Sequence, residues 1–345
     1  MKIGILPFSN DLESPGDRRR IAFWARIRGH DLVLDLAQKY DVLFVSERAN
    51  FFSPAVLESK RPIVFDLIDG YLQQDSFVND MTRGTMKSML GELTKQPRLF
   101  TKSVAEMCAR SSAVICSSVE QQLLIEQFNK NCHIILDIHA EIPSLDFKKI
   151  EESRISVFWE GQPATLNPLA KLIAEIEESD YLRIQSYELV SDQLSYRLLG
   201  KYFPRPINVV LKKHIPKNSR EKVHVNSWDL NNLSAAASRS NLALLPVNLE
   251  SRFQGLKPEN RLLIMWKMGL PVLASASMSH RRVENEIGEV FTCETINEWM
   301  NRIGDMASNY GAGERQVRLG KEYLKMYHTT EILLAKWDKV FETIS

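Results

Sequence analysis

The sequence predicts an α/β protein made of two Rossmann-like, doubly wound domains that face a central cleft. Short, apolar, β-branched runs alternate with longer segments of helical period along the whole chain, which is typical of parallel sheets covered by helices. A polar stretch from Glu141 to Arg154 interrupts this alternation, and a new strand-like run begins at Ile155. The 345 residues are 44% hydrophobic and 25% charged, which is enough for two cores. We therefore expect domains at 1–145 and 146–328, with 329–345 forming a helix that returns to the first domain.

The first half contains the β-branched runs and amphipathic segments of one doubly wound domain. The expected strands are Lys2–Leu6, Asp31–Leu36, Asp41–Val45, Pro62–Ile68, Ala113–Ser117 and Cys132–Ile138. The expected helices are Asp17–Arg28, Asp75–Leu90, Pro97–Arg110 and Val119–Asn129.

The second half repeats this alternation and ends in two long helices. The expected strands are Ile155–Trp159, Leu182–Tyr187, Ile207–Leu211, Val223–Val225, Leu242–Val247, Pro271–Ala274 and Glu289–Thr292. The closing helices are expected at Arg315–Met326 and Thr330–Ile344. Two such domains are expected to bind their ligand in the cleft between them, beyond the carboxyl ends of the strands.

Composition narrows the classes of partner. The 44 Lys and Arg residues balance 43 Asp and Glu residues, so the net charge of +1 does not favour nucleic acid as a partner. The four cysteines have no short paired spacing, and the first residues lack the apolar core of a signal peptide, so we expect a reducing cytoplasm. No apolar run approaches the roughly 20 residues of a membrane-spanning helix, so a membrane contact would be peripheral.

The stretch GLKPENRLLIMWKMGLPVLAS, from Gly255 to Ser275, predicts a phosphate site. Pro258 suits the first turn of a helix, where the backbone N–H groups have no partner within the helix and carry the positive end of its dipole. Lys257 and Arg261 would add full charges to this tip. The alternative is that both cations are solvated and pair with Glu259 or Glu250.

This stretch resembles the donor half of the GT-B glycosyltransferases, in particular the large retaining group known as glycosyltransferase family 4. The strongest likeness is Asn241–Ser275, with the strand ending Leu-Leu-Pro-Val and the Gly269-Leu-Pro-Val-Leu-Ala-Ser turn. The loop within Gly4–Arg20, the Trp159-Glu160-Gly161 turn and the final helix are also similar. The resemblance covers most of the chain.

The resemblance implies that the second domain binds a nucleotide diphosphate sugar, UDP- or GDP-linked, as a co-substrate. Carried over to this sequence, Val225, Asn226 and Trp228 would border the base. The diphosphate or ribose would be held by residues of the helix tip, namely Lys257, Asn260 and Arg261. Glu259, at the same tip, is a further donor-binding candidate that could accept hydrogen bonds from the sugar. Trp228 has the alternative of packing into the core.

One departure from the family concerns a pair of glutamates eight residues apart. Those positions hold Leu256 and Ile264 in this sequence, and neither side chain can accept a hydrogen bond from a sugar. The departure leaves open which sugar is bound and whether the anomeric configuration is retained or inverted. It also leaves open a catalytically silent homologue that acts as a partner or binding protein, and a sugar-nucleotide epimerase remains a further alternative.

The first loop, PFSNDLESPGDRRR, is expected to line the cleft, with Gly16 allowing a close backbone approach to a ligand. The helix that follows carries five arginines between Arg18 and Arg28 among aromatic residues. This mixture suits an anionic, lipid-linked acceptor at the inner face of a membrane. The ordinary alternative is a solvated basic face over an apolar underside.

For proton transfer the candidates are acidic or imidazole groups near strand ends. Asp69, in the sequence VFDLIDGY, follows its strand and is the preferred catalytic residue, with His139 in ILDIHAE as the second. His139 has a structural alternative, and Asp66, inside the apolar strand, is expected to be a paired structural carboxylate. Asp137 and Glu141 complete the set of candidates.

No resident cofactor or metal is expected. The sequence has no Asp-x-Asp after a strand, no cysteine cluster and no His-x-x-x-His, and Lys257 and Arg261 could neutralise a departing diphosphate without magnesium. Dinucleotide, P-loop and Gly-x-Ser-x-Gly motifs are also missing. These absences predict a metal-independent enzyme. The resemblance implies a hexosyltransferase with a saccharide or lipid-linked hydroxyl acceptor, in surface polysaccharide or glycolipid synthesis.

Overall fold

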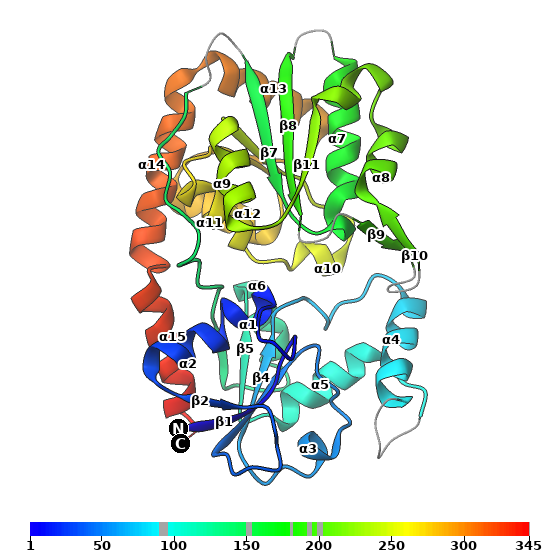
Figure 1. Cartoon of the computed structure of the whole chain (residues 1–345), viewed down its shortest axis with the longest axis vertical. Coiled ribbons are helices and arrows are strands. Elements are labelled where there is room, and N and C mark those ends of the chain that lie inside the picture. The colour runs from blue at the N-terminus through cyan, green and yellow to red at the C-terminus, as the bar shows by residue number, and fades with distance from the viewer. Residues whose placement is uncertain (90–95, 150–153, 180–181, 192–194, 199–202, 345) are drawn as a thin grey trace. The chain divides into compact units, whose positions relative to one another are not determined.

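The chain is divided into two compact units, each built on a parallel six-stranded sheet (Figure 1). The computed structural model describes residues 1–89, 96–149, 154–179, 182–191, 195–198 and 203–344. Unit 1 comprises residues 1–140, 250–258 and 328–345, and unit 2 comprises residues 141–249 and 259–327. The expected two-domain α/β class is confirmed.

The sheet of unit 1 has the strand order β2-β1-β3-β4-β5-β6, and every neighbouring pair is parallel. Every residue of β3, β4 and β5 is buried, as expected for strands that are covered on both faces. The bounds of the strands are β1 Lys2–Leu6, β2 Asp31–Val33, β3 Val42–Ser46, β4 Ile63–Leu67, β5 Ala113–Cys116 and β6 Cys132–Ile134.

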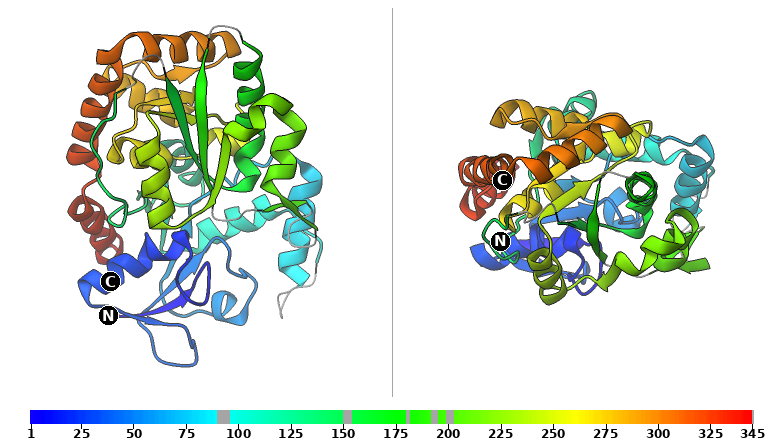
Figure 2. Two further views of the ribbon diagram at one scale, coloured as in Figure 1. Left: turned by 45° about the horizontal axis from the view of Figure 1, so that its top comes forward. Right: turned by 90° about the horizontal axis from the view of Figure 1, so that it is seen from above.

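The last helix of the chain packs within unit 1, against α2. Trp24 of α2 stacks on Phe341 of α15 with ring centroids 4.5 Å apart, and it stacks on Trp337 at 6.0 Å. The two termini consequently lie near each other in this unit (Figure 2). The helices of unit 1 are α1 Pro15–Arg18, α2 Ile21–Arg28, α3 Pro54–Leu57, α4 Phe77–Met89, α5 Phe100–Arg110, α6 Val119–Ile125, α10 Arg252–Gly255 and α15 Thr330–Glu342.

The sheet of unit 2 has the order β11-β8-β7-β12-β13-β14, which is the order of a doubly wound dinucleotide-binding sheet when its strands are counted along the chain. All neighbouring pairs are parallel. The strands are β7 Ile155–Glu160, β8 Ile184–Ser191, β11 Val223–Ser227, β12 Leu242–Leu245, β13 Val272–Ser275 and β14 Thr292–Cys293.

Helices cover both faces of this sheet. One apolar core joins Val157, Tyr187 and Leu189 to buried residues of α7, α8 and α13. Helix α9 packs on β7 and β8 but contributes nothing to that core, so it covers the other face. The helices of unit 2 are α7 Leu166–Glu178, α8 Ile207–His214, α9 Leu230–Arg239, α11 Asn260–Lys267, α12 Met278–Ile287, α13 Ile296–Ser308 and α14 Tyr310–Tyr327, and the 3-10 turns are η1 Pro163–Thr165 and η2 Lys217–Lys222.

Two expectations about individual elements were wrong. The run from Ile207 to Leu211 forms helix α8 instead of a strand, because Ile207 and Leu211, four residues apart, both turn to the core of unit 2. The predicted helix Asp17–Arg28 is broken at Arg20, whose φ of −128° and ψ of −114° separate α1 from α2. An antiparallel pair that was not expected, β9 Ser195–Leu198 with β10 Phe203–Pro206, also occurs in unit 2. The predicted helix end at Leu90 and the linker residues 150–153 lie outside the described residues.

Among the described residues, no helix is both long enough and apolar enough to cross a bilayer.

Candidate functional site

Both sheets contain a point at which the winding of the chain reverses, and in open α/β sheets ligands bind beyond the carboxyl ends of the strands at such points. In unit 2 this point lies between β7 and β12, and in unit 1 it lies between β1 and β3. The residues directly after β7 and β3 are therefore the first places to seek functional side chains.

In unit 2, Arg261 occupies the reversal point. Its side chain leaves the first turn of α11, and Nη1 donates a hydrogen bond of 3.3 Å to the carbonyl oxygen of Glu160, the last residue of β7. Burial lowers the pKa of Arg261, because the guanidinium has lost much of its water. A desolvated guanidinium beside strand ends is well suited to bind an anion through two parallel hydrogen bonds.

Gly161 makes room for this arginine. A Cβ atom at position 161 would lie 3.0 Å from Arg261 Nη1 and 2.7 Å from the ring of Trp159. The turn after β7 therefore requires a residue without a side chain, which agrees with the Trp-Glu-Gly turn singled out in the sequence.

Helix α11 begins later than expected. It starts at Asn260 and has Glu259 as its N-cap, so Pro258 precedes the helix instead of occupying its first turn. Glu259 does not cap the helix with its side chain; both carboxylate oxygens accept from Nη2 of Arg282, each at 3.1 Å. Its carboxylate therefore pairs with a cation on α12 instead of capping the amides at the start of α11.

The residues proposed to border a base lie at the end of the edge strand β11. Asn226 is within β11, and the side-chain nitrogen Nδ2 is buried with no hydrogen-bond partner. Trp228 follows the strand, and its backbone N–H donates to the carbonyl oxygen of Ser191, the last residue of β8, at 2.7 Å. Both residues therefore lie at the same carboxyl edge of the sheet as Arg261.

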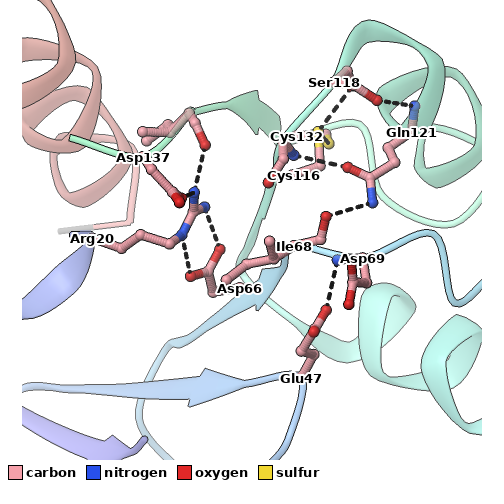
Figure 3. Close-up of polar contacts among 12 residues, drawn as sticks. Arg20, Glu47, Asp66, Ile68, Asp69, Cys116, Ser118, Gln121, Cys132 and Asp137 are labelled. Carbon is pink, nitrogen blue, oxygen red and sulfur yellow. Dashed lines mark hydrogen bonds and ion pairs between the residues drawn. The ribbon is translucent and has the colours of Figure 1, made fainter. Parts of the chain in front are cut away.

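In unit 1, Glu47 and Asp69 come together at the ends of the adjacent strands β3 and β4. The backbone N–H of Asp69 donates to Glu47 Oε2 at 2.8 Å (Figure 3). Gln121 of α6 fixes the same turn, because its Nε2 donates to the carbonyl oxygen of Ile68 at 3.0 Å. Asp69 is thus held on both sides by buried polar side chains.

The segment 250–258 covers this turn and brings Lys257 to it. Lys257 Nζ lies 3.9 Å from Asp69 Oδ1, and both side chains are partly exposed, at 28% and 31%. Leu256 packs so closely on Gly70 that a Cβ atom there would lie 2.9 Å from Leu256 Cβ. Because of these contacts, the segment 250–258 belongs to unit 1. The sequence had placed it in the predicted second domain, 146–328.

The charges around Asp69 are strongly perturbed. Burial, and then the neighbouring Asp69 carboxylate, raise the pKa of Glu47 to about 8. Burial, and then the nearby Arg83, lower the pKa of Lys87 to about 7, and Lys87 Nζ donates to the carbonyl oxygens of Glu47 and Ala49 at 2.8 Å each. Glu47 therefore holds a proton near neutral pH, and the partly exposed Asp69 lies beside it.

Asp66 is a structural carboxylate, as the sequence indicated. It accepts from Arg20 Nε at 2.8 Å and from Arg20 Nη2 at 2.6 Å, and both side chains are fully buried. Arg20 Nη1 also donates to Asp137 Oδ1 at 3.2 Å. His139 is buried two residues further on, with 8% of its surface exposed, and Glu141 is the first residue of unit 2.

Several arginines of the predicted helix Asp17–Arg28 bind acidic residues of unit 1 or are buried in it. Arg20 binds Asp66, and Arg28 binds Asp338 at 2.8 Å and Glu331 at 2.8 Å. Arg19 is buried with 5% exposed, and Arg26 is exposed. Gly16 lies against the ring of Phe8, with a notional Cβ atom 2.8 Å from it, so packing within the loop alone explains that glycine.

Glu47 and Lys87 were not among the candidate functional residues that the sequence predicted. Glu47 carried the same signal that selected Asp69, a carboxylate directly after a buried strand, and the rule applied to Asp41–Val45 would have found it. Lys87 carried no such signal, because it lies inside a predicted helix and not at a strand end. No group of three or more His, Cys, Asp or Glu that could hold a metal ion occurs among the described residues.

The two positions where the family has glutamates are apolar and buried here. Leu256 is 3% exposed and Ile264 is 3% exposed. Ile264 lies inside α11, and Leu256 is the residue that packs on Gly70. The structure therefore offers no carboxylate at these two positions.

Neither a protein-family model nor a curated protein sequence matches the chain. Solved structures do match it in fold. An α-glucosyltransferase (AGT) in complex with UDP is 12% identical, with a TM-score of 0.60 over 99% of this chain and 100% of that one. WaaG, a glycosyltransferase involved in lipopolysaccharide biosynthesis, is 13% identical, with a TM-score of 0.54 over the whole of both chains.

A mutant of S. aureus TarM, solved with fondaparinux, α-GlcNAc-glycerol and UDP, is 14% identical with a TM-score of 0.59. The match covers 87% of this chain but only 55% of the TarM chain, so the chain spans about half the length of that protein. These similarities confirm the GT-B fold that the sequence resemblance implied.

Proposed function

We propose that the protein is a glycosyltransferase that moves a hexose from a nucleotide diphosphate sugar to a hydroxyl acceptor. The observation that carries this proposal is the position of Arg261, a desolvated cation at the reversal point of the unit 2 sheet, in the first turn of a helix. The GT-B fold supports the choice of reaction class. UDP or GDP is the proposed nucleotide, and the AGT and TarM structures contain UDP.

The donor would be held by unit 2. Arg261 and the amides of the first turn of α11 would bind the diphosphate, which is the part of the donor that gains negative charge as it departs. Asn226, with its unpartnered Nδ2, would donate to the base or ribose, and Trp228 would offer a ring to the base. Because cations and helix amides can neutralise this charge, the proposal includes no metal ion.

The acceptor would be activated in unit 1. The bond between the anomeric carbon and the phosphate oxygen breaks, and a bond from that carbon to the acceptor oxygen forms. In an inverting transfer the acceptor proton would pass to Asp69, whereas in a retaining transfer it would pass to the departing diphosphate. His139 is the second candidate base, although its burial leaves Asp69 better placed to meet a substrate.

The acceptor class and location extend the proposal further. A saccharide or lipid-linked hydroxyl acceptor, in the cytoplasm, would suit a role in surface polysaccharide or glycolipid synthesis. A contact with the membrane through the region Arg18–Arg28 would depend mainly on the exposed Arg26, because Arg20 and Arg28 are already paired.

Thermal unfolding with a nucleotide panel tests the donor site. UDP or GDP should raise the melting temperature, because a ligand at 100 times its Kd stabilises the folded state by about 2.7 kcal/mol. Arg261→Ala should remove most of this increase. Arg318→Ala is the matched control, since Arg318 is 59% exposed in an ion pair on α14. If neither nucleotide changes the melting temperature of the wild type, the proposal is wrong.

A second function is favoured by Leu256 and Ile264, which leave the protein without the two family glutamates. A nucleotide-sugar-binding protein that has lost catalysis would show the Arg261-dependent shift in melting temperature without hydrolysis or transfer of the donor. Measuring nucleotide release from a panel of nucleotide sugars, with and without sugar acceptors, separates it from the transferase. An epimerase would consume the donor without an acceptor and release no nucleotide.

A further inference from the structure

Unit 2 contains a polar cavity at the amino ends of its strands. It has a volume of about 620 Å³, within the range of small-molecule sites. Ser156 lies near the start of β7 and Glu160 ends that strand, so along β7 the cavity is about 13 Å from the end where Arg261 binds. The lining residues are Lys148, Lys149, Arg154, Ser156, Gln185, Ser186, Glu188, His224, Arg239 and Asn241.

The floor of this cavity is polar where a covered parallel sheet is normally apolar. The strand register pairs Ser156 with Ser186 and Glu188 with His224, so these four side chains share one face of the sheet. The residues between them, such as Tyr187, face the apolar core on the other side. Ser156 and Glu188 are buried on this face, whereas Ser186 and His224 are more exposed, so the floor offers polar groups that a polar ligand could contact.

The rim is strongly basic. Among the lining residues that the structure describes, four cations, Lys148, Lys149, Arg154 and Arg239, accompany one carboxylate, that of Glu188. These residues carry three more positive than negative charges, in a protein whose net charge is +1. Glu188 is 3% exposed and accepts from Arg239 Nη2 at 2.5 Å. The concentration of charge is therefore local to this cavity.

The rim is also fixed in place. Asn241 Oδ1 accepts from the backbone N–H of Ser156 at 2.9 Å, and its Nδ2 donates to the carbonyl oxygen of Arg154 at 2.9 Å. Lys148 Nζ donates to the carbonyl oxygen of Ser238, at the end of α9, at 3.1 Å. These bonds hold the backbone at Arg154 and the ammonium group of Lys148, so this part of the rim loses less entropy when it binds an anion.

We infer that this cavity binds a phosphate monoester that also carries hydroxyl groups, such as a sugar phosphate. The phosphate would lie against Arg154 and the lysines, because guanidinium and ammonium groups bind phosphate oxygens with charge-assisted hydrogen bonds. The hydroxyl groups would reach the floor, where Glu188, the two serines and His224 can accept or donate. This site is separate from the proposed donor site and does not depend on the proposed reaction.

Calorimetric titration of the full-length protein with glucose 6-phosphate, at constant ionic strength, tests the inference. We expect saturable binding of glucose 6-phosphate, weaker binding of inorganic phosphate and no binding of glucose. Arg154→Glu should weaken the binding of glucose 6-phosphate at least tenfold. Lys171→Glu, an equal change of charge at an exposed position on α7, should leave the affinity unchanged.

Three results would overturn the inference. One is the absence of saturable binding of glucose 6-phosphate. Another is an equal loss of affinity in Arg154→Glu and Lys171→Glu, which would indicate a general charge effect. The third is loss of binding in Arg261→Ala, which would move the ligand to the donor site. If Arg154→Glu does not fold, His224→Glu on the edge strand β11 replaces it, with the same tenfold loss expected.

Discussion

The reversal points of the two sheets carry different side chains. In unit 2 the side chain at this point is a cation, Arg261, whose guanidinium contacts the end of β7. In unit 1 the side chain at this point is a carboxyl group, that of Glu47 after β3, and Asp69 lies beside it after the neighbouring strand β4. In the proposed reaction the site in unit 2 would bind an anion and the site in unit 1 would transfer a proton.

The contrast follows from the residues that each strand end supplies. An arginine on a helix tip adds its charge to the positive end of the helix dipole, which favours phosphate. Burial, and then the neighbouring Asp69, raise the pKa of Glu47 to about 8, so Glu47 keeps its proton near neutral pH. Charge at the strand ends, more than fold, thus distinguishes the proposed donor unit from the proposed acceptor unit.

The largest effect that would test this contrast is expected from Asp69→Asn. If the transfer is inverting, replacing the proposed base by an amide should lower glycosyl transfer by about 100-fold or more, since general base catalysis contributes about 10² to 10⁴. A much smaller loss would indicate that the departing diphosphate takes the proton, as in a retaining transfer. Nucleotide binding, measured by the change in melting temperature, should stay as in the wild type. If Asp69→Asn abolishes nucleotide binding, the division of roles between the two units is wrong.

The next largest effect is expected from comparing the stability of two variants of unit 1. Asp66→Asn removes one partner of the buried pair with Arg20, and should lower the free energy of unfolding by about 3 kcal/mol or more. Asp69 is partly exposed, so Asp69→Asn should change the free energy of unfolding much less. Urea unfolding of both variants measures the difference. Equal destabilisation by the two substitutions would assign Asp69 a structural role.

The strands were the most predictable part of the fold. The run Lys2–Leu6 was predicted with the bounds that the structure has, because a short β-branched run before a turn-rich loop has few alternatives. The run Ile207–Leu211 has the same local preference, yet it forms α8, because packing in the core of unit 2 overrides strand propensity. Local strand propensity therefore does not predict the element at positions where packing in the core determines it.

The candidate site was only partly predictable, for a similar reason. Arg261 and Asp69 could be selected because each follows a strand or begins a helix in the sequence. Glu47 gains its importance from Asp69, which is 22 residues away, and from burial, and neither can be read from one position. The basic cavity of unit 2 was missed entirely, since its cations come from a polar linker and from the end of α9.

The pH dependence of stability tests the protonation of Glu47. Its pKa is raised from 4.5 in the unfolded chain to about 8 in the folded state, so between these values the folded state holds a proton that the unfolded state has lost. The free energy of unfolding contributed by Glu47 therefore falls as the pH rises from about 5 to 8. Glu47→Gln should remove this fall, so its stability relative to the wild type should increase across that window.

Urea unfolding at pH 5, 6, 7 and 8 measures this dependence. Glu58→Gln, a change at an exposed glutamate of the same unit, should run parallel to the wild type at all four values. If the stability of Glu47→Gln also runs parallel to that of the wild type, Glu47 is ionised at all four pH values. The assignment of a proton to Glu47 at neutral pH would then be wrong.

The smallest effect is expected from Lys257→Ala, and it refines the boundary between the two roles. Lys257 and Arg261 are four residues apart in the sequence, but Lys257 pairs with Asp69 in unit 1 at 3.9 Å, whereas Arg261 contacts Glu160 in unit 2. A partly exposed pair at this distance contributes about 0–1 kcal/mol to stability, so Lys257→Ala should leave the free energy of unfolding almost unchanged.

If Lys257 interacts mainly with Asp69, Lys257→Ala should weaken nucleotide binding less than Arg261→Ala does. It should also lower the rate of transfer more than it lowers nucleotide affinity. An equal loss of nucleotide affinity in Lys257→Ala and Arg261→Ala would instead make both cations part of the diphosphate site, because only a shared anionic ligand would couple them so strongly.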